Sequence, residues 1–236
     1  MAAVPVSRTS STRARPEVLD VGCGTGISAR QFQAHGCDVL GVDVDSKMVE
    51  IARRQGLTAE VSAFETWDAR GRTFDAVVAG QTWHWVDPVA GAAKARSVLR
   101  PGGLLALFWN VLQPPEELAE ATVALYRRFV PELPMMHKPV SALDVYGVMF
   151  RKAEEGIRSS GGASGGFSEP VRLRFDWERT YTRDEWLDVV PTQGGHSRLP
   201  ASTLDALLAG IGDAVDAMGG SFVARYAAVA VTASAL

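Results

Sequence analysis

Two hydrophobic periods alternate along the first half of the chain. Short apolar runs bounded by glycine, proline or polar residues are typical of buried strands, and we place five of them at 17–21, 38–42, 58–62, 74–79 and 103–110. Stretches with helical spacing of apolar residues separate them, at 27–35, 46–55 and 88–99. Ser46 and Pro88 suit the starts of the second and third helices. The alternation predicts βαβ units in an α/β fold with a mostly parallel sheet.

The pattern in the second half of the chain predicts fewer and longer helices and strands. We expect an amphipathic helix at 116–129, strands at 171–181 and 221–233, and a helix at 201–218. Thr182 and Glu185 have the spacing of a capping box, which predicts a further helix after residue 182. The stretch 131–166 contains three prolines and the run GGASGG, so we interpret it as an irregular insert or lid, either functional or disordered. After a disordered tail at 1–16, residues 17–236 are expected to form a single domain.

Composition narrows the class of protein. The 236 residues are 47% hydrophobic with a formal net charge of −3, which argues against a general nucleic-acid partner. No apolar run reaches the length of about 18 residues that suggests a membrane helix. Cys23 and Cys37 lack zinc-type spacing, so we expect reduced thiols and no metal site. These features predict a soluble, cytoplasmic protein.

The glycine-rich stretch after the first strand is the strongest chemical signal. In EVLDVGCGTG at 17–26, glycines alternate with Cys23 and Thr25, which permits left-handed backbone angles and close approach of a ligand. The dinucleotide fingerprint would need its third glycine at position 27, where the chain has Ile27. Asp20, beside the loop, suits an ammonium group better than a pyrophosphate. A zwitterionic ligand is favoured, and an NAD(P)-dependent oxidoreductase is the less favoured alternative.

The segment LDVGCGTG is similar to motif I of the class I S-adenosylmethionine-dependent methyltransferases. Four further segments resemble the following motifs of that family, in order and at compatible spacing: GVDVD at 41–45, SAFE at 62–65, FDAVVAGQTWHWVDP at 74–88 and LRPGGLLALFWN at 99–110. The remainder of the chain looks more loosely like the C-terminal part of a small-molecule subgroup similar to methyltransferase type 11. Family members usually carry helices before motif I, and few residues precede it here.

The resemblance implies a Rossmann-like, doubly wound, seven-stranded sheet with an antiparallel last strand, and S-adenosyl-L-methionine as cofactor. Asp43 matches the acidic residue that binds both ribose hydroxyls, and Met48 would flank the adenine. The cofactor-binding residues implied as a set are Asp20, Gly22, Cys23, Gly24, Gly26, Asp43, Val44, Met48, Ala63, Phe64, Gly80 and Gln81.

Methyl transfer is an in-line displacement, so positioning and exclusion of water can supply most of the catalysis. An acceptor hydroxyl or protonated amine needs a base within hydrogen-bonding reach. His84, between Trp83 and Trp85, is the candidate base, although a packed or hydrogen-bonded histidine is the alternative interpretation.

Trp83, Trp85, Trp109 and Asn110 are the candidate walls of the acceptor site. For His137 and His196 we favour solvated loop positions over contact with a substrate. We expect a monomer or homodimer that methylates a small molecule. A protein that binds S-adenosylmethionine without catalysis, as a regulator or partner subunit, is the alternative from another class.

Overall fold

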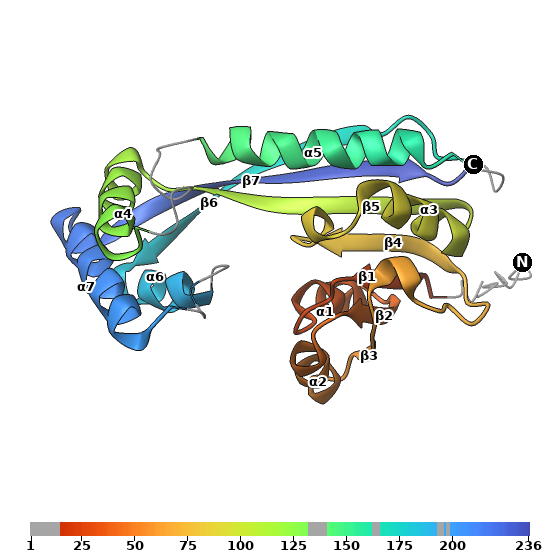
Figure 1. The fold of residues 1–236 in the computed structure, drawn as a ribbon, viewed down its shortest axis with the longest axis horizontal. Coiled ribbons are helices and arrows are strands. Elements are labelled where there is room, and N and C mark those ends of the chain that lie inside the picture. The colour runs from red at the N-terminus through yellow and green to blue at the C-terminus, as the bar shows by residue number, and fades with distance from the viewer. Residues whose placement is uncertain (1–14, 132–140, 162–165, 193–195, 197–198) are drawn as a thin grey trace, which may run out of the picture. The chain divides into compact units, whose positions relative to one another are not determined.

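The computed structural model describes residues 15–131, 141–161, 166–192, 196 and 199–236. Seven strands form one sheet in the order β3-β2-β1-β4-β5-β7-β6 (Figure 1). The first pairs of strands are parallel, and β6 and β7 are antiparallel. The mixed, mostly parallel sheet with alternating helices confirms the predicted fold class. The chain divides into two compact units, one made of 1–106, 157–169 and 233–236, the other of 107–156 and 170–232.

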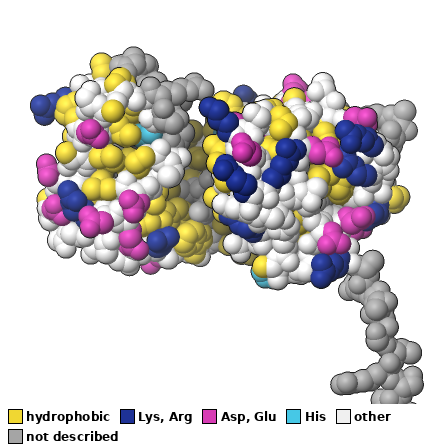
Figure 2. Space-filling model, turned by 90° about the horizontal axis from the view of Figure 1, so that it is seen from below, with side chains coloured by type: hydrophobic (Ala, Val, Ile, Leu, Met, Phe, Trp, Pro, Cys, Tyr) yellow, Lys and Arg dark blue, Asp and Glu magenta, His cyan; other side chains and the backbone are white. Residues whose placement is uncertain are grey.

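The described surface carries charges of both signs. Basic and acidic side chains are interspersed over the face drawn in Figure 2, without a large area of one sign. Within the described ranges, no helix is both long and apolar enough to cross a membrane.

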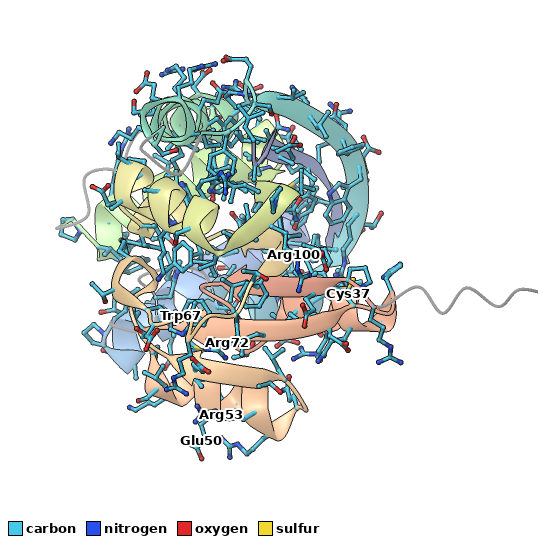
Figure 3. All side chains as sticks on the ribbon, turned by 90° about the vertical axis from the view of Figure 1, so that its right-hand side faces the viewer. Cys37, Glu50, Arg53, Trp67, Arg72 and Arg100 are labelled. Carbon is cyan, nitrogen blue, oxygen red and sulfur yellow. The ribbon has the colours of Figure 1, made fainter. Side chains whose placement is uncertain are left out.

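Parallel pairing in the first unit brings four strand ends together. The strands are β1 (Glu17–Val21), β2 (Asp38–Asp43), β3 (Thr58–Val61) and β4 (Phe74–Gly80), each within two residues of its predicted bounds. Val21 is level with Val42, and Asp43 is level with Val61. At the opposite end, Arg100 forms ion pairs with Glu17 and Asp75, which joins the beginnings of β1 and β4 (Figure 3). The carboxyl ends of the strands therefore share one edge of the sheet.

The helices of this unit begin and end close to the predicted residues. They are α1 (Ile27–Ala34), α2 (Ser46–Arg54) and α3 (Pro88–Val98). Pro88 is indeed in the first turn of α3, but the side chains that cap α2 and α3 belong to Asp45 and Asp87. Each carboxylate accepts hydrogen bonds from two backbone N–H groups of the first turn. Sequence reasoning placed the starts correctly and missed both capping residues.

Strand β5 (Leu99–Gln113) is longer than the predicted 103–110. Residues 100–102, which precede the predicted strand, continue it because the backbone there has a partner near the end of the chain. The Gly102 N–H donates to the Ala235 carbonyl, and the Ala235 N–H donates to the Gly103 carbonyl. Gly102 has a φ of +75°, which only glycine adopts without strain.

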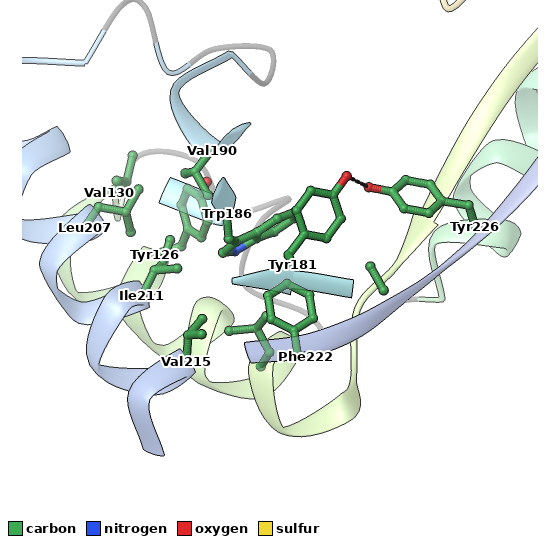
Figure 4. Close-up of a cluster of buried hydrophobic side chains, with 12 residues drawn as sticks. Tyr126, Val130, Tyr181, Trp186, Val190, Leu207, Ile211, Val215, Phe222 and Tyr226 are labelled. Atoms are coloured by element: carbon green, nitrogen blue, oxygen red, sulfur yellow. Dashed lines mark hydrogen bonds between the residues drawn. The ribbon is translucent and has the colours of Figure 1, made fainter. Parts of the chain in front are cut away.

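The second unit has its own core. It contains α4 (Glu116–Phe129), β6 (Val171–Thr182), α6 (Arg183–Val189), the 3₁₀ turn η4 (Val190–Thr192), α7 (Ala201–Ala217) and most of β7 (Ser221–Ser234). Buried side chains of these elements surround Trp186, and the Tyr181 hydroxyl lies 2.7 Å from that of Tyr226 (Figure 4). The predicted capping box of Thr182 and Glu185 is present.

The segment 131–166 is not uniformly irregular, because it contains the 18-residue helix α5 (Ala142–Ser159). Phe150, Ala153 and Ile157 are buried, at the spacing of one helix face, and their burial explains why the helix forms. Residues 1–14, 132–140 and 162–165, which include most of the expected tail, the GGASGG run in part and His137, lie outside the described residues. The lid and the single-domain organisation stay predictions.

Candidate functional site

The glycine loop has the backbone geometry that its sequence predicts. Gly22, Gly24 and Gly26 have φ values of +65°, +53° and +82°. The loop is attached to β2, since the Gly22 N–H donates to the Val42 carbonyl at 2.7 Å. A Cβ at Gly22 would stand 2.1 Å from Thr82 Cγ2, whereas a Cβ at Gly24 would meet nothing within 4 Å. The loop thus packs tightly at its first glycine and has open space at its second.

Asp43, the last residue of β2, is held in place by backbone groups. One carboxylate oxygen accepts from the Gly24 N–H and the other from the Asp45 N–H, each at 2.8 Å. The Ser62 N–H donates to the Asp43 carbonyl. Each carboxylate oxygen keeps further lone pairs, because an ionised carboxylate accepts about four hydrogen bonds. Asp43 therefore joins the loops that follow β1, β2 and β3 and still has acceptor capacity.

A pocket of about 200 Å³ opens beside Asp43 at the carboxyl edge of the strands. Its lining residues are Val21, Gly22, Val42, Asp43, Val44, Ser62, Phe64, Glu65, Thr82, Trp85 and Val86. Five of the predicted site residues meet here: Gly22, Asp43, Val44, Phe64 and Trp85. Val44, which lines the pocket, is 70% exposed, and Met48 in the first turn of α2 is 42% exposed, so both leave apolar side-chain surface open.

Asp20 lies beneath the loop, fully buried, and offers its carboxylate no direct access to a ligand's ammonium group. One oxygen accepts from the Ser28 hydroxyl at 2.8 Å, and the other has no hydrogen-bond partner among the described residues. Burial raises the pKa of Asp20 from 3.8 to about 7, against the opposing effect of the Ser28 hydrogen bond. Asp20 therefore does not contact an ammonium group as predicted, because its carboxyl is buried and only one of its two oxygens accepts a hydrogen bond.

Cys23 is also buried rather than open to the pocket. Burial raises the pKa of its thiol to about 12, so the side chain is an inert thiol and only its backbone belongs to the loop. Among the described residues both cysteines are free, as predicted.

The segment QTWHW after β4 divides between core and solvent. Trp83 begins the 3₁₀ turn η2 (Trp83–Trp85), is 3% exposed and packs against Phe64 at 6.2 Å between ring centroids. Trp85 is 82% exposed and lines the pocket. Trp83 therefore belongs to the core and leaves the set of candidate acceptor-binding residues, while Trp85 keeps its place.

His84, between Trp83 and Trp85, is exposed. Its ring centroid lies 4.9 Å from that of Trp85, and partial desolvation lowers its pKa below the usual 6.5. It does not line the pocket of about 200 Å³.

The remaining predicted cofactor residues sit at loop and turn positions. Gly26 precedes α1, and Ala63 precedes the 3₁₀ turn η1 (Phe64–Thr66). Gly80 ends β4, and Gln81 follows it with a φ of +57°, an unusual value for a residue other than glycine. Strained backbone of this kind clusters at functional sites.

Trp109 and Asn110 belong to the second compact unit. Trp109 is 1% exposed and packs on Phe150, so it is a core residue and not a wall of an acceptor site. The Asn110 side-chain oxygen accepts from Trp177 Nε1 at 3.1 Å. His196, expected in a solvated loop, is instead 3% exposed, with its Nε2 next to the Tyr126 hydroxyl.

Sequence reasoning missed Ser28, Thr82 and Val86. Thr82 donates to the Gly22 carbonyl at 3.3 Å and lines the pocket together with Val86. Ser28 holds the buried carboxyl of Asp20. Sixty positions separate Thr82 from Gly22, so no local spacing could have indicated that contact. Ser28 carries no signal beyond its place in the first turn of α1.

A glycine loop after β1 and an acid at the end of β2 are features that nucleotide-binding Rossmann-like folds share. Residues 19–107 match the model of the family described as a methyltransferase domain. The match confirms the resemblance stated from the motifs of this segment.

The chain is 38% identical over 95 residues to an uncharacterized methyltransferase of Mycobacterium tuberculosis (strain ATCC 25618 / H37Rv), with 39% of each chain covered. It is 34% identical over 95 residues to the ubiquinone biosynthesis O-methyltransferase of Cereibacter sphaeroides (strain ATCC 17025 / ATH 2.4.3), covering 37% of this chain and 38% of the relative. The matches thus span about two fifths of the curated relatives.

Similar solved structures extend over nearly the whole chain. A protein of Anaeromyxobacter dehalogenans, provisionally assigned as a type II methyltransferase, aligns with a TM-score of 0.59 at 22% identity and covers 94% of this chain and 91% of its own. The YcgJ protein of Bacillus subtilis aligns with a TM-score of 0.51 at 18% identity, covering 96% and 94%. At these identities the likeness establishes the fold alone.

Proposed function

We propose that the protein is an S-adenosylmethionine-dependent methyltransferase that transfers a methyl group to a small-molecule acceptor. The observation that carries the proposal is the Asp43 carboxylate, which two backbone N–H groups hold beside an apolar pocket at the end of β2. It lies within the segment that matches the methyltransferase domain model.

The residues around the pocket fit the cofactor. Asp43 has free acceptor capacity for two ribose hydroxyls. Val44 and Met48, both exposed, would flank a planar base, with Phe64 at its edge. The open space where a Cβ of Gly24 would stand allows a ligand to approach the loop backbone.

The bound cofactor would supply a methyl group on a positively charged sulfur, a good leaving group. The chain would contribute position and the exclusion of water, for which the exposed indole of Trp85 at the pocket is suited. His84 is the proposed base. Its lowered pKa keeps the imidazole neutral at pH 7, so that a ring nitrogen can accept a proton from the acceptor.

One observation supports a small acceptor, and the names of relatives bear on the methylated atom. Charges of both signs are interspersed on the face drawn in Figure 2, which does not suit a polyanion. Relatives of the matched segment are named ubiquinone biosynthesis O-methyltransferase and malonyl-[acyl-carrier protein] O-methyltransferase. Their names favour an oxygen atom of the acceptor as the methylated position.

Isothermal titration with S-adenosylhomocysteine tests the cofactor site. We expect saturable binding to the wild type and a dissociation constant about 100-fold larger for Asp43→Ala, since two hydrogen bonds to a charged group contribute roughly 3 kcal/mol. Asp38→Ala is the matched control, because it removes an exposed aspartate from the other end of the same strand. Equal affinity of the two variants, or tighter binding of NAD(P)H than of S-adenosylhomocysteine, would refute the proposed site.

Turnover is tested separately, by formation of S-adenosylhomocysteine from S-adenosylmethionine over a panel of hydroxyl and carboxylate acceptors. With an accepted substrate, His84→Ala should lower kcat by roughly 10²- to 10⁴-fold and leave S-adenosylhomocysteine affinity unchanged. An unchanged kcat would remove His84 from the mechanism. Tight cofactor binding without turnover of any acceptor would favour the alternative, a binding protein without catalysis.

A further inference from the structure

Strand β6 is an edge strand of the sheet that no other described strand covers. It is the last strand in the order, and β7 is its one neighbour among the described strands (Figure 1). It is 12 residues long, and all of its residues except Tyr181 are exposed. A long exposed edge presents a row of unpaired N–H and C=O groups that can pair with another chain.

The two faces of β6 differ in kind. Between 171 and 177, odd-numbered positions carry large apolar side chains that are between 41% and 62% exposed: Val171, Leu173, Phe175 and Trp177. Between 172 and 178, even-numbered positions carry charges in the order plus, plus, minus, minus: Arg172, Arg174, Asp176 and Glu178. Charged residues alone are a common protection of an edge, but a row of exposed apolar residues beside them is not.

The hydrogen bonds at the end of β6 show which residues face the free edge. The register of β6 and β7 pairs Thr182 with Ser221, so Arg183 is opposite Gly220. The Arg183 N–H donates to the Gly220 carbonyl, while the Thr182 N–H donates to Glu185 instead. Because alternate residues of an antiparallel pair are hydrogen-bonded, odd-numbered residues bond to β7. Even-numbered residues direct their backbone groups outward.

We propose that β6 pairs with β6 of a second copy of this chain, antiparallel, about a two-fold axis at Phe175. In this register Arg172 lies opposite Glu178 of the second copy, and Arg174 lies opposite Asp176. Symmetry repeats both pairs, so four oppositely charged pairs form and no like charges meet. On the apolar face, Phe175 meets its own copy and Leu173 meets Trp177, contacts that stabilise neighbouring strands.

Charge selects this register among its neighbours. A two-fold axis at Arg174 or at Asp176 places that residue opposite itself. With the axis at residue 173, Arg172 faces Arg174, and with the axis at residue 177, Asp176 faces Glu178. Each of these registers sets like charges directly opposite one another, which destabilises a strand pair.

The charges are available for a second copy. Arg174 and Asp176 pair with each other at 2.8 Å, with side chains 51% and 63% exposed, and Glu178 pairs with an exposed Arg225 at 3.1 Å. Exposed pairs of this kind contribute little and exchange readily. Arg172 pairs with Glu154 at 2.7 Å, but a guanidinium has five N–H donors and can serve two carboxylates.

Sedimentation velocity of the full chain over a concentration series tests the proposal. We expect a monomer–dimer equilibrium in the wild type. Arg174→Asp and Asp176→Arg each put like charges opposite one another at two symmetric places, and each should raise the dimer dissociation constant at least about tenfold. Arg54→Asp, the same charge change on the exposed surface of α2, is the control and should leave the constant unchanged.

Rescue tests the register independently of folding. An equimolar mixture of Arg174→Asp and Asp176→Arg chains restores opposite charges in a heterodimer, and the double variant restores them in a homodimer. Both should dimerise as the wild type does. A wild type that stays monomeric, a dimer that Arg174→Asp does not weaken, or a failure of both rescues would each overturn the proposal.

A disulfide gives a second readout of the register. In a Cys37→Ser background, Phe175→Cys places two thiols at the two-fold axis, in a non-hydrogen-bonded pair whose Cα atoms are about 4.5 Å apart, within disulfide range. Oxidation should give a covalent dimer. Leu173→Cys alone should not, but it should cross-link in a mixture with Trp177→Cys. Equal cross-linking of every variant would contradict the register. Neither test involves the cofactor, so failure here leaves the proposed function unaffected.

Discussion

The buried carboxyl of Asp20 predicts an unusual dependence of stability on pH. Its pKa is about 7 in the folded protein because burial disfavours the charged form, against 3.8 for an exposed aspartate. The folded state therefore binds a proton more readily than the unfolded state between these values. Stability from this group is greatest below pH 4, falls as pH rises to about 7, and is constant above.

The size of the effect follows from the difference in pKa. About three pKa units at 1.36 kcal/mol each correspond to a loss of about 4 kcal/mol between pH 4 and pH 7. Asp20→Asn removes the titration, while the amide is similar in size to the neutral carboxyl and can still bond to the Ser28 hydroxyl. The stability of the variant relative to the wild type should therefore increase by about 1.4 kcal/mol per pH unit over this window.

Urea unfolding followed by tryptophan fluorescence, at intervals between pH 4.5 and pH 8, measures the difference between the two proteins. Taking the difference cancels the titration of groups that both proteins share. Val18→Ala, a neutral substitution in the same buried strand, is the control and should differ from the wild type by an amount independent of pH. Parallel curves for Asp20→Asn and the wild type would refute the reasoning that burial governs this carboxyl.

Two further predictions concern the same unit. Gly22→Ala should destabilise the fold by about 2–4 kcal/mol, because the new Cβ would sit at a positive φ and 2.1 Å from Thr82 Cγ2. Gly36 also has a positive φ but open space around it, so Gly36→Ala should cost only about 1 kcal/mol. Thermal unfolding compares them, and equal losses would contradict the contact with Thr82. Glu60 accepts hydrogen bonds from Arg72 and Trp67, and the Arg72 guanidinium is the main cause that lowers its pKa to about 2. This stabilisation is present above pH 4.5 and is lost as pH falls toward 2. Glu60→Gln should therefore cost roughly 1–2 kcal/mol of unfolding free energy at pH 7, after allowance for partial exposure, and much less at pH 3. Equal losses at both pH values in urea unfolding would contradict this prediction.

The sequence by itself determined the backbone of the site. Apolar runs predicted β1 to β4 within two residues, and the alternating glycines of the loop have the positive φ values that only glycine adopts freely. The position of Asp43 at the end of β2 also followed from the motif order. These features depend on short stretches of chain, because strand period and glycine conformation are local properties.

Only the tertiary structure decided which side chains face the site. Trp83 and Trp85 are two residues apart, yet one packs on Phe64 in the core and the other lies at the pocket. Asp20 is fully buried, which the residues next to it in sequence did not indicate. β5 begins earlier than predicted because the backbone of Gly102 and Gly103 forms hydrogen bonds with Ala235. Burial and strand pairing join residues far apart in the chain, so their outcome depends on the assembled fold and not on local pattern.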